Sequence, residues 1–260
     1  YQTSATFNNL TAGTYNIIVQ DYNGCTDSVP VQVTEPELLD ISISNTIDVD
    51  CYGNSSGQVS IAVSGGTTDY EYSIDGTNYQ LSPTFNNLSQ GAYNIIVEDE
   101  NGCIDSIPIQ INQPINPLSN LSGFIEPSCY TGQDGSITIT SNGGTLPYTY
   151  SIDNGLNYQT SATFNNLTAG TYNIIVQDYN LCQYNLLVVV DQPEAITNIS
   201  TYNQPLCNGD QNGSITITSN GGTLPYTYSI DNGLNYQTSA TFNNLTAGTY
   251  NIIVQDYNGC

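Results

Sequence analysis

Seven cysteines are the residues whose type and spacing most clearly point to chemistry. Four of them follow a recurring Tyr-Asn-Ile-Ile-Val segment that leads into Asn-x-Cys, and they lie 78 or 79 residues apart. Three others form a second series with a spacing of 78 residues. The first series is Cys25, Cys103, Cys182 and Cys260, and the second is Cys51, Cys129 and Cys207. Regular cysteines without a Cys-x-x-Cys pair favour a disulfide framework in an oxidising compartment over a metal-thiolate centre.

Oxygen-bearing side chains suggest a second chemistry, the binding of Ca²⁺, which prefers carboxylate and carbonyl ligands. The stretch Asn208-Gly-Asp210-Gln-Asn212-Gly213 resembles the beginning of a calcium loop, so Asn208, Asp210 and Asn212 are candidate ligands. It lacks a downstream bidentate Glu, and the equivalent stretches elsewhere in the chain do not keep these residues. We therefore favour a polar turn that opens a strand, and we expect no cofactor other than this candidate Ca²⁺.

The cysteine spacing reflects an internal repeat. Gly135–Asn180 is identical to Gly213–Asn258, and Tyr1–Cys25 is identical to Tyr236–Cys260. Self-similarity at a fixed period is typical of a tandem array. We predict four modules, numbered 1 to 4: the C-terminal part of a module at 1–36, complete modules at 37–114 and 115–193, and a module without its last strand at 194–260.

Within each module the apolar residues alternate with polar ones, which predicts β-strands. In module 3 the alternating apolar positions are Ile137 and Ile139, then Tyr148, Tyr150 and Ile152, then Tyr172, Ile174 and Val176, and finally Leu186, Val188 and Val190. Turn sequences rich in Asn and Gly separate these runs, and no amphipathic helical pattern competes with them. The fold class that we predict is all-β: a tandem array of immunoglobulin-like antiparallel β-sandwich modules with one disulfide each.

Two disulfide pairings are compatible with this repeat. Pairing within modules gives Cys51–Cys103, Cys129–Cys182 and Cys207–Cys260, with Cys25 bonded to an upstream module, whereas pairing across modules gives Cys25–Cys51, Cys103–Cys129 and Cys182–Cys207. If the strands simply alternate up and down, Cys129 and Cys182 lie at the same end of a module, while Cys103 and Cys129 lie about one module length apart. A disulfide requires a Cα separation of about 4.4–6.8 Å. We therefore predict pairing within modules, which would stabilise each by roughly 4 kcal/mol in the chain-entropy model.

A tyrosine follows a glycine-containing corner at the start of the penultimate strand of every module. In module 3 the segment is Leu167-Thr-Ala-Gly170-Thr-Tyr172. This arrangement resembles the tyrosine corner of immunoglobulin-like sandwiches, in which the hydroxyl bonds to the backbone a few residues upstream. The predicted corner residues are Tyr15, Tyr93, Tyr172 and Tyr250.

The charge of the chain excludes several functions. It contains 23 Asp and Glu residues but no Lys, Arg or His, which gives a formal net charge of −23. Nucleic acids and anionic membrane surfaces are therefore excluded as partners, because binding them requires cations. Histidine-dependent catalytic triads and lysine Schiff bases cannot be built either. No apolar run approaches the length of a membrane span. We predict that the protein is not an enzyme and does not insert into a membrane.

The combined pattern resembles a known family. Its elements are Cys207-Asn-Gly-Asp-Gln-Asn-Gly-Ser-Ile, Gly221-Gly-Thr-Leu-Pro-Tyr-Thr-Tyr-Ser-Ile, Leu245-Thr-Ala-Gly-Thr-Tyr and Asp256-Tyr-Asn-Gly-Cys260. Together they are similar to the SprB repeat of very large surface adhesins of gliding Bacteroidota. The resemblance implies type IX secretion, display on the outer cell surface, and a role in adhesion or gliding motility, with no catalytic residues. In module 2, Thr68-Asp69-Tyr70 replaces the Leu-Pro-Tyr of the family pattern.

We therefore predict that the chain is a structural stalk segment of an extracellular adhesin or filament, whose partners are neighbouring modules of the same chain. Repeated modules that bind polysaccharide, other surfaces or proteins by avidity are one alternative, and a self-associating extracellular filament is another. Ser28 and Ser106, in Asp-Ser-aliphatic triplets, resemble the O-glycosylation acceptors of Bacteroidota and are candidate modification sites.

Overall fold

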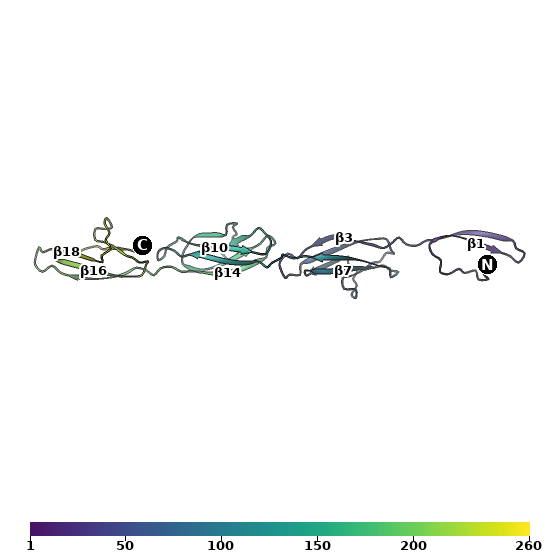
Figure 1. The fold of residues 1–260 in the computed structure, drawn as a ribbon, viewed down its shortest axis with the longest axis horizontal. Helices are drawn as coiled ribbons and strands as arrows, with labels where there is room; N and C mark the ends of the chain where they lie inside the picture. Colours follow the sequence, from purple (N-terminus) through teal and green to yellow (C-terminus); the bar gives the residue numbers. More distant parts are fainter. The chain divides into compact units, whose positions relative to one another are not determined.

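The computed structural model describes residues 1–260, and all of its regular elements are β-strands (Figure 1). Module 1 contains β1 (Gly13–Gln20) and β2 (Thr26–Val33). Module 2 contains β3 (Asp40–Ile47), β4 (Gly57–Ser64), β5 (Glu71–Ser73), β6 (Thr84–Leu88), β7 (Gly91–Glu98) and β8 (Ile104–Ile111). Module 3 contains β9 (Ser119–Ile125), β10 (Gly135–Asn142), β11 (Thr149–Ser151), β12 (Thr163–Leu167), β13 (Gly170–Gln177) and β14 (Gln183–Val190). Module 4 contains β15 (Thr197–Asn203), β16 (Gly213–Asn220), β17 (Thr227–Ser229), β18 (Thr241–Leu245) and β19 (Ile253–Gln255).

The strands form small antiparallel sheets that confirm the predicted all-β tandem fold. Module 2 has one sheet with the order β3-β4-β6 and another with the order β5-β7-β8, and module 3 repeats this as β9-β10-β12 and β11-β13-β14. Module 4 has β15-β16-β18 and the two-stranded sheet β17-β19, while module 1 has only β1-β2. The chain divides into two compact units, residues 1–113 and 114–260. No helix long and apolar enough to cross a membrane is present.

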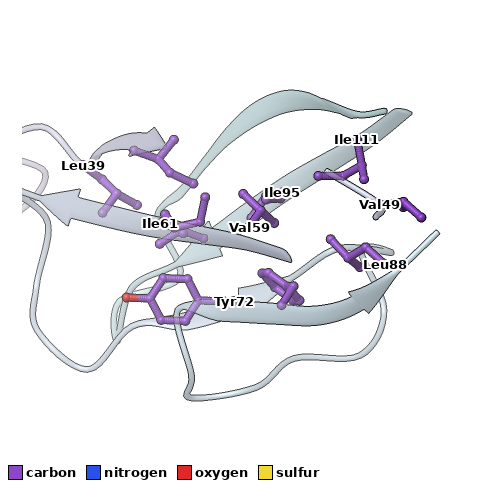
Figure 2. Close-up of a cluster of buried hydrophobic side chains, with 11 residues drawn as sticks. Leu39, Val49, Val59, Ile61, Tyr72, Leu88, Ile95 and Ile111 are labelled. Carbon is purple, nitrogen blue, oxygen red and sulfur yellow. The ribbon is translucent and has the colours of Figure 1, made fainter. Parts of the chain in front are cut away.

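Each complete module has its own apolar core between its two sheets. In module 2 the core includes Val59, Ile95 and Ile111, which have no exposed surface, and Figure 2 shows these side chains meeting between the strands. In module 3 the same role falls to Ile137 and Ile174. These residues come from the alternating positions of the sequence, because every second side chain of a strand points to the same face. Because the chain has no Lys, Arg or His, no ion pair between side chains supports these cores.

Module 4 is less completely packed, because no closing strand equivalent to β14 is present within residues 194–260. Only Ile217, Tyr228 and Phe242 are buried in its core cluster. Ile215 is half-buried, whereas its counterpart Ile137 in module 3 is fully buried. The closing strand therefore covers one side of the core in the complete modules.

The direction of the strands decides which loops share an end of a module. In module 3, Gly135 at the start of β10 pairs with Leu167 at the end of β12, and β13 begins only three residues later at Gly170. At the other end of the module, Thr149 of β11 pairs with Gln177, the last residue of β13. Since β12 is antiparallel to β10 and β11 is antiparallel to β13, β11 and β12 both run toward the Gly135 end. The chain thus changes sheets between these two strands without reversing its net direction.

Candidate functional site: the disulfide between successive modules

A disulfide joins module 3 to module 4. It links Cys129 to Cys260, which are 131 residues apart in sequence and have a Cα–Cα distance of 5.7 Å. Cys51 and Cys182 are also disulfide-bonded, whereas Cys25, Cys103 and Cys207 are free and exposed. The predicted pairing of Cys51–Cys103, Cys129–Cys182 and Cys207–Cys260 within modules is therefore wrong, and so is the expectation of one disulfide inside each module.

The strand directions explain this correction. The prediction assumed that the strands between Cys129 and Cys182 alternate in direction, which would bring both cysteines to one end. Because β11 and β12 run the same way, β13 carries the chain away from the Cys129 end. Its eight residues span about 26 Å at about 3.3 Å per residue. Cys182 therefore lies at the far end of module 3, and the end that carries Cys129 meets the Cys260 end of module 4.

Two kinds of loop present the sulfur atoms. We call the loop after the first strand of a module the Cys turn, as in residues 128–134. We call the segment from the acidic residue to the cysteine after the penultimate strand the Asp corner, as in residues 256–260. The Cys129–Cys260 bond brings the Cys turn of module 3 against the Asp corner of module 4.

The Asp corner is built around one buried carboxylate. Asp256 is 5% exposed, and its Oδ1 accepts hydrogen bonds from the N–H groups of Asn258 (3.0 Å) and Cys260 (2.9 Å). Its Oδ2 accepts a hydrogen bond from the Thr223 N–H at 2.7 Å. The backbone N–H of Asp256 in turn donates to the Cys260 carbonyl at 3.2 Å. These bonds fix the backbone of Cys260 and therefore the position from which its sulfur reaches module 3.

Backbone N–H groups take the place of a cation in this corner. A buried carboxylate needs compensation for its lost hydration, and the chain has no Lys, Arg or His to provide it. In module 2 the equivalent Asp99 is 4% exposed and accepts bonds from the N–H groups of Thr67 and Cys103. The pKa of Asp99 is lowered from its ordinary value, chiefly by the Thr67 N–H and then by the Cys103 N–H. The carboxylate is thus held in its charged form by oriented backbone dipoles.

A Gly-Gly turn allows the backbone to approach this carboxylate. In module 4, a Cβ on Gly222 would lie 2.7 Å from Asp256 Oδ2. A Cβ on the preceding Gly221 would lie 2.1 Å from the Ala195 carbonyl oxygen, and Gly221 has a φ of +81°. Both the close approach and the left-handed conformation favour glycine. The turn that ends β16 is therefore part of the Asp corner, although it lies more than thirty residues earlier in the chain.

The Cys turn has its own internal support and also contacts the facing corner. The Ser128 N–H donates to Asp134 Oδ1 at 2.9 Å, and the Gly132 N–H donates to the Cys129 carbonyl at 2.9 Å. The hydrogen bonds from the Ser128 hydroxyl and N–H lower the pKa of Asp134. Across the junction, Asn258 Nδ2 donates to the Ser128 carbonyl at 2.9 Å. A hydrogen bond therefore accompanies the disulfide between the two modules.

The four predicted tyrosine-corner residues each donate a hydrogen bond to a carbonyl four residues upstream. The distances are 2.8 Å from Tyr15 to Thr11, 3.0 Å from Tyr93 to Ser89, 2.8 Å from Tyr172 to Thr168, and 2.9 Å from Tyr250 to Thr246. In modules 2 to 4 each bond lies in the connection between the two strands that precede the Asp corner. Tyr15, Tyr93 and Tyr172 lie near the beginning of β1, β7 and β13, and Tyr250 lies three residues before β19.

The candidate calcium ligands of module 4 lie in its Cys turn. Asp210 Oδ2 accepts a hydrogen bond from the Cys207 N–H at 3.0 Å, and Asn212 Oδ1 accepts one from the Leu206 N–H at 3.0 Å. Asn208 is exposed in the same turn. No group of three or more His, Cys, Asp or Glu side chains is arranged to hold a metal ion. The interactions of Asp210 and Asn212 are those of a structured turn.

The candidate glycosylation residues are exposed on closing strands. Ser28 lies on β2 and Ser106 on β8, and the N–H of each donates to the preceding aspartate at 2.8 Å. Nothing covers either hydroxyl within its own module. Both remain candidates for modification.

Module 4 contains a hollow of about 790 Å³. It is lined by Gly213, Leu245 and Tyr250 among others. In module 2 the corresponding glycine, Gly57, lies against the Ile111 side chain of the closing strand β8. The hollow therefore lies at a position that, in module 2, is occupied by a side chain of the closing strand.

The buried aspartates of the Asp corners are the functional residues that the sequence reasoning missed. In the sequence, Asp99 and Asp256 each stand just before an Asn-Gly-Cys turn, and no local pattern marks them as buried. The signal that could have identified them is their constant spacing, since Asp21, Asp99, Asp178 and Asp256 each precede a cysteine by four residues. The chain has no cationic side chains to pair with a carboxylate. An aspartate that always stands four residues before a cysteine therefore indicates a hydrogen-bond acceptor for the backbone of that corner.

The fold and its junction define a class: an all-β protein of tandem immunoglobulin-like modules with disulfides. Within that class, the chain contains SprB repeats. The SprB repeat model matches residues 43–78, 126–157 and 199–235, one position in each of modules 2, 3 and 4. The SprB repeat is that of a gliding-motility surface adhesin of Bacteroidetes, so the resemblance seen in the sequence is confirmed. The chain is accordingly a repetitive segment in which SprB repeats recur from module to module.

Solved structures with a similar fold are also tandem-domain proteins. The N-terminal eight Ig domains of Down Syndrome Cell Adhesion Molecule match at 11% identity over 94% of this chain and 39% of that chain, with a TM-score of 0.39. Protocadherin gamma B2 cadherin domains 1–5 match at 12% identity, over 95% of this chain and 69% of that chain, with a TM-score of 0.26. A tetra-tandem repeat from the extending region of a large adhesion protein matches at 14% identity, over 95% and 71%, with a TM-score of 0.24. These similarities concern the fold alone. Among curated proteins, none matches the chain.

Proposed function

We propose that the chain is a stalk segment of a secreted cell-surface adhesin that serves surface adhesion or gliding, reaching the outer surface through type IX secretion. The observation that carries this proposal is the covalent junction between Cys129 and Cys260. A protein that only displays binding modules needs no covalent bond from one module to the next. A stalk under tension does, because the bond limits how far the chain extends if a module unfolds.

The bond changes the path along which force travels. When the chain is pulled at its ends, tension passes directly from Cys129 to Cys260, so the intervening residues cannot be drawn out. The loop between them covers 131 positions. At about 3.5 Å per extended residue it contains about 45 nm of chain. The disulfide therefore keeps at least that length from being released.

Single-molecule force spectroscopy tests this proposal. The chain is held at its two ends and extended until every module has unfolded, once oxidised and once after reduction. We expect the reduced chain to extend at least about 45 nm further than the oxidised chain. Equal contour lengths would remove the mechanical argument for a stalk.

A second candidate function is supported by exposed aromatic side chains. Tyr130, Tyr158 and Tyr179 are 52%, 37% and 69% exposed, and aromatic rings of this kind can stack on sugars. Repeated weak sites of this type would act by avidity. A glycan array probed with the chain separates the two functions: saturable binding that is lost on replacing these tyrosines with alanine would favour a binding array.

A further inference from the structure

The free cysteines occupy loops that are already folded like their disulfide-bonded counterparts. In the Cys turn of module 4, the Asp210 N–H donates to the Cys207 carbonyl at 3.1 Å. The corresponding bond in module 3 runs from the Gly132 N–H to the Cys129 carbonyl at 2.9 Å. The Cys turn thus has the same backbone bond whether its sulfur is bonded or free.

The two Cys turns also share a hydrogen bond from a backbone N–H group to a side chain. The Leu206 N–H donates to Asn212 Oδ1 at 3.0 Å, just as the Ser128 N–H donates to Asp134 Oδ1 at 2.9 Å. In each pair the acceptor lies six residues after the donor, so the two turns have the same register. The loop that presents Cys207 therefore shares these two hydrogen bonds with the loop that presents the bonded Cys129.

The free Asp corners show the same agreement. The Cys103 N–H donates to Asp99 Oδ1 at 2.8 Å, and the Cys25 N–H donates to Asp21 Oδ1 at 2.8 Å. The bonded Cys260 has the equivalent bond to Asp256 at 2.9 Å. Each of these corners also contains an asparagine two residues before the cysteine, the residue that in module 4 reaches across to the Ser128 carbonyl.

We infer that Cys207 is a covalent linking site for the Asp corner of another module, and that Cys25 and Cys103 are receiving sites for the Cys turn of another module. The partner in each case is a module of this same kind, either in the same polypeptide or in a second copy. The rule is that a Cys turn bonds an Asp corner and that neither loop bonds its own type. It rests on the geometry of the junction and would hold even if the stalk proposal failed.

The chemistry of linkage is thiol–disulfide exchange with a disulfide oxidant such as oxidised glutathione. The Cys207 thiolate attacks one sulfur of the oxidant and releases one glutathione thiolate, which leaves a mixed disulfide. The thiolate of a receiving cysteine then attacks the Cys207 sulfur and releases the second glutathione thiolate. Two protein thiols lose two electrons and two protons in total, and one oxidised glutathione becomes two reduced molecules.

The selectivity of the pairing provides the test. The purified chain, with its existing disulfides intact, is incubated with oxidised glutathione, and the new bonds are mapped by mass spectrometry of peptic peptides. We expect Cys207–Cys25 or Cys207–Cys103 bonds in at least tenfold excess over Cys207–Cys207 bonds. Comparable amounts of all pairings would overturn the inference, because exposed thiols without a preferred partner pair at random.

A displaced thiol is the matched control. The double variant Cys25→Ser, Tyr22→Cys moves the thiol three positions within the same corner to a fully exposed residue. We expect this thiol to bond Cys207 at least tenfold more slowly than Cys25 does, and an equal rate would refute the role of the corner. Cys207→Ser should abolish the mapped bonds, and their persistence would also count against the inference. Dilution of the protein shows which polypeptide supplies the partner cysteine. A rate of disulfide formation proportional to protein concentration indicates a second copy, whereas a rate independent of concentration indicates a bond within one polypeptide.

Discussion

Removing the Cys129–Cys260 bond should uncouple the unfolding of modules 3 and 4. The perturbation is the double variant Cys129→Ser, Cys260→Ser, which leaves the two cores untouched. Neither core contains these residues, whose place is in the loops of the junction. The bond therefore acts through the unfolded state, by restricting the conformations of the chain that it closes.

The size of the stabilisation by the disulfide depends on how much of the chain between Cys129 and Cys260 is unfolded. If module 3 unfolds while module 4 stays folded, the flexible segment from Cys129 to the start of β15 has about 70 residues, and closing it costs the unfolded chain roughly 4 kcal/mol of entropy. If both modules unfold, the loop of 131 residues gives only about 5 kcal/mol in total. The bond thus stabilises the first module to unfold by roughly 4 kcal/mol and the second by only about 1 kcal/mol.

Hydrogen exchange measured in increasing urea tests this reasoning, because it follows the two modules separately. In the oxidised protein we expect β10 and β13 to lose protection at the same urea concentration as β16 and β18. In the double variant we expect two separate transitions, both at lower urea. The variant Cys207→Ser is the control, since that thiol is free, and it should leave the transitions unchanged. Identical transitions in the oxidised protein and the double variant would refute the argument.

Three further predictions concern the supports of the junction and the modules. Gly143→Ala should destabilise module 3 by roughly 2–3 kcal/mol, because its Cβ would lie 2.0 Å from the Pro117 carbonyl oxygen and its φ is +74°; a urea midpoint unchanged from the parent would contradict this. Tyr172→Phe should cost about 1 kcal/mol through loss of the bond to the Thr168 carbonyl, whereas Tyr179→Phe, at an exposed ring, should cost nothing in the same denaturation assay. The pKa of Asp153 is lowered to about 2, first by the Asn157 N–H, so its contribution to stability is present above about pH 4 and is lost as the pH falls through 2. With no His in the chain, the urea midpoint should be constant between about pH 5 and 8, and a midpoint that changes there or stays constant down to about pH 2 would be inconsistent with this account.

The strands and their inward faces could be predicted from the sequence because they depend on local alternation. Ile137, Ile174 and Val188 occupy every second position of their segments, and all three are buried. The tyrosine at position 172 could likewise be placed at a corner, because a glycine precedes it and a regular strand follows it. Both inferences use information that lies within about ten residues.

The disulfide pairing could not be predicted in this way, since it depends on the direction of one short strand. Counting the strands between Cys129 and Cys182 gives the correct number, but Thr163–Leu167 continues in the direction of Thr149–Ser151. The pairing of Gly135 with Leu167 determines this direction. The two strands lie about thirty residues apart, so their register cannot be predicted from the sequence of either strand alone. The buried Asp178 escaped notice for a related reason, because its partner, the Thr145 N–H, lies in a distant turn.

The placement of Cys129 and Cys182 at opposite ends of one module also constrains the order of events when the protein is made. A polypeptide emerges from its N-terminus, so Cys182 becomes accessible to Cys129 before Cys260 does. While the segment is unfolded, the nearer cysteine is the easier partner, because a shorter loop closes at a lower entropic cost. Once module 3 has folded, β13 holds these two sulfurs apart, and Cys129 bonds the Asp corner of the following module instead. Correct linkage therefore requires each module to fold before it is oxidised, so that the folded sandwich itself protects its cysteine from the wrong bond.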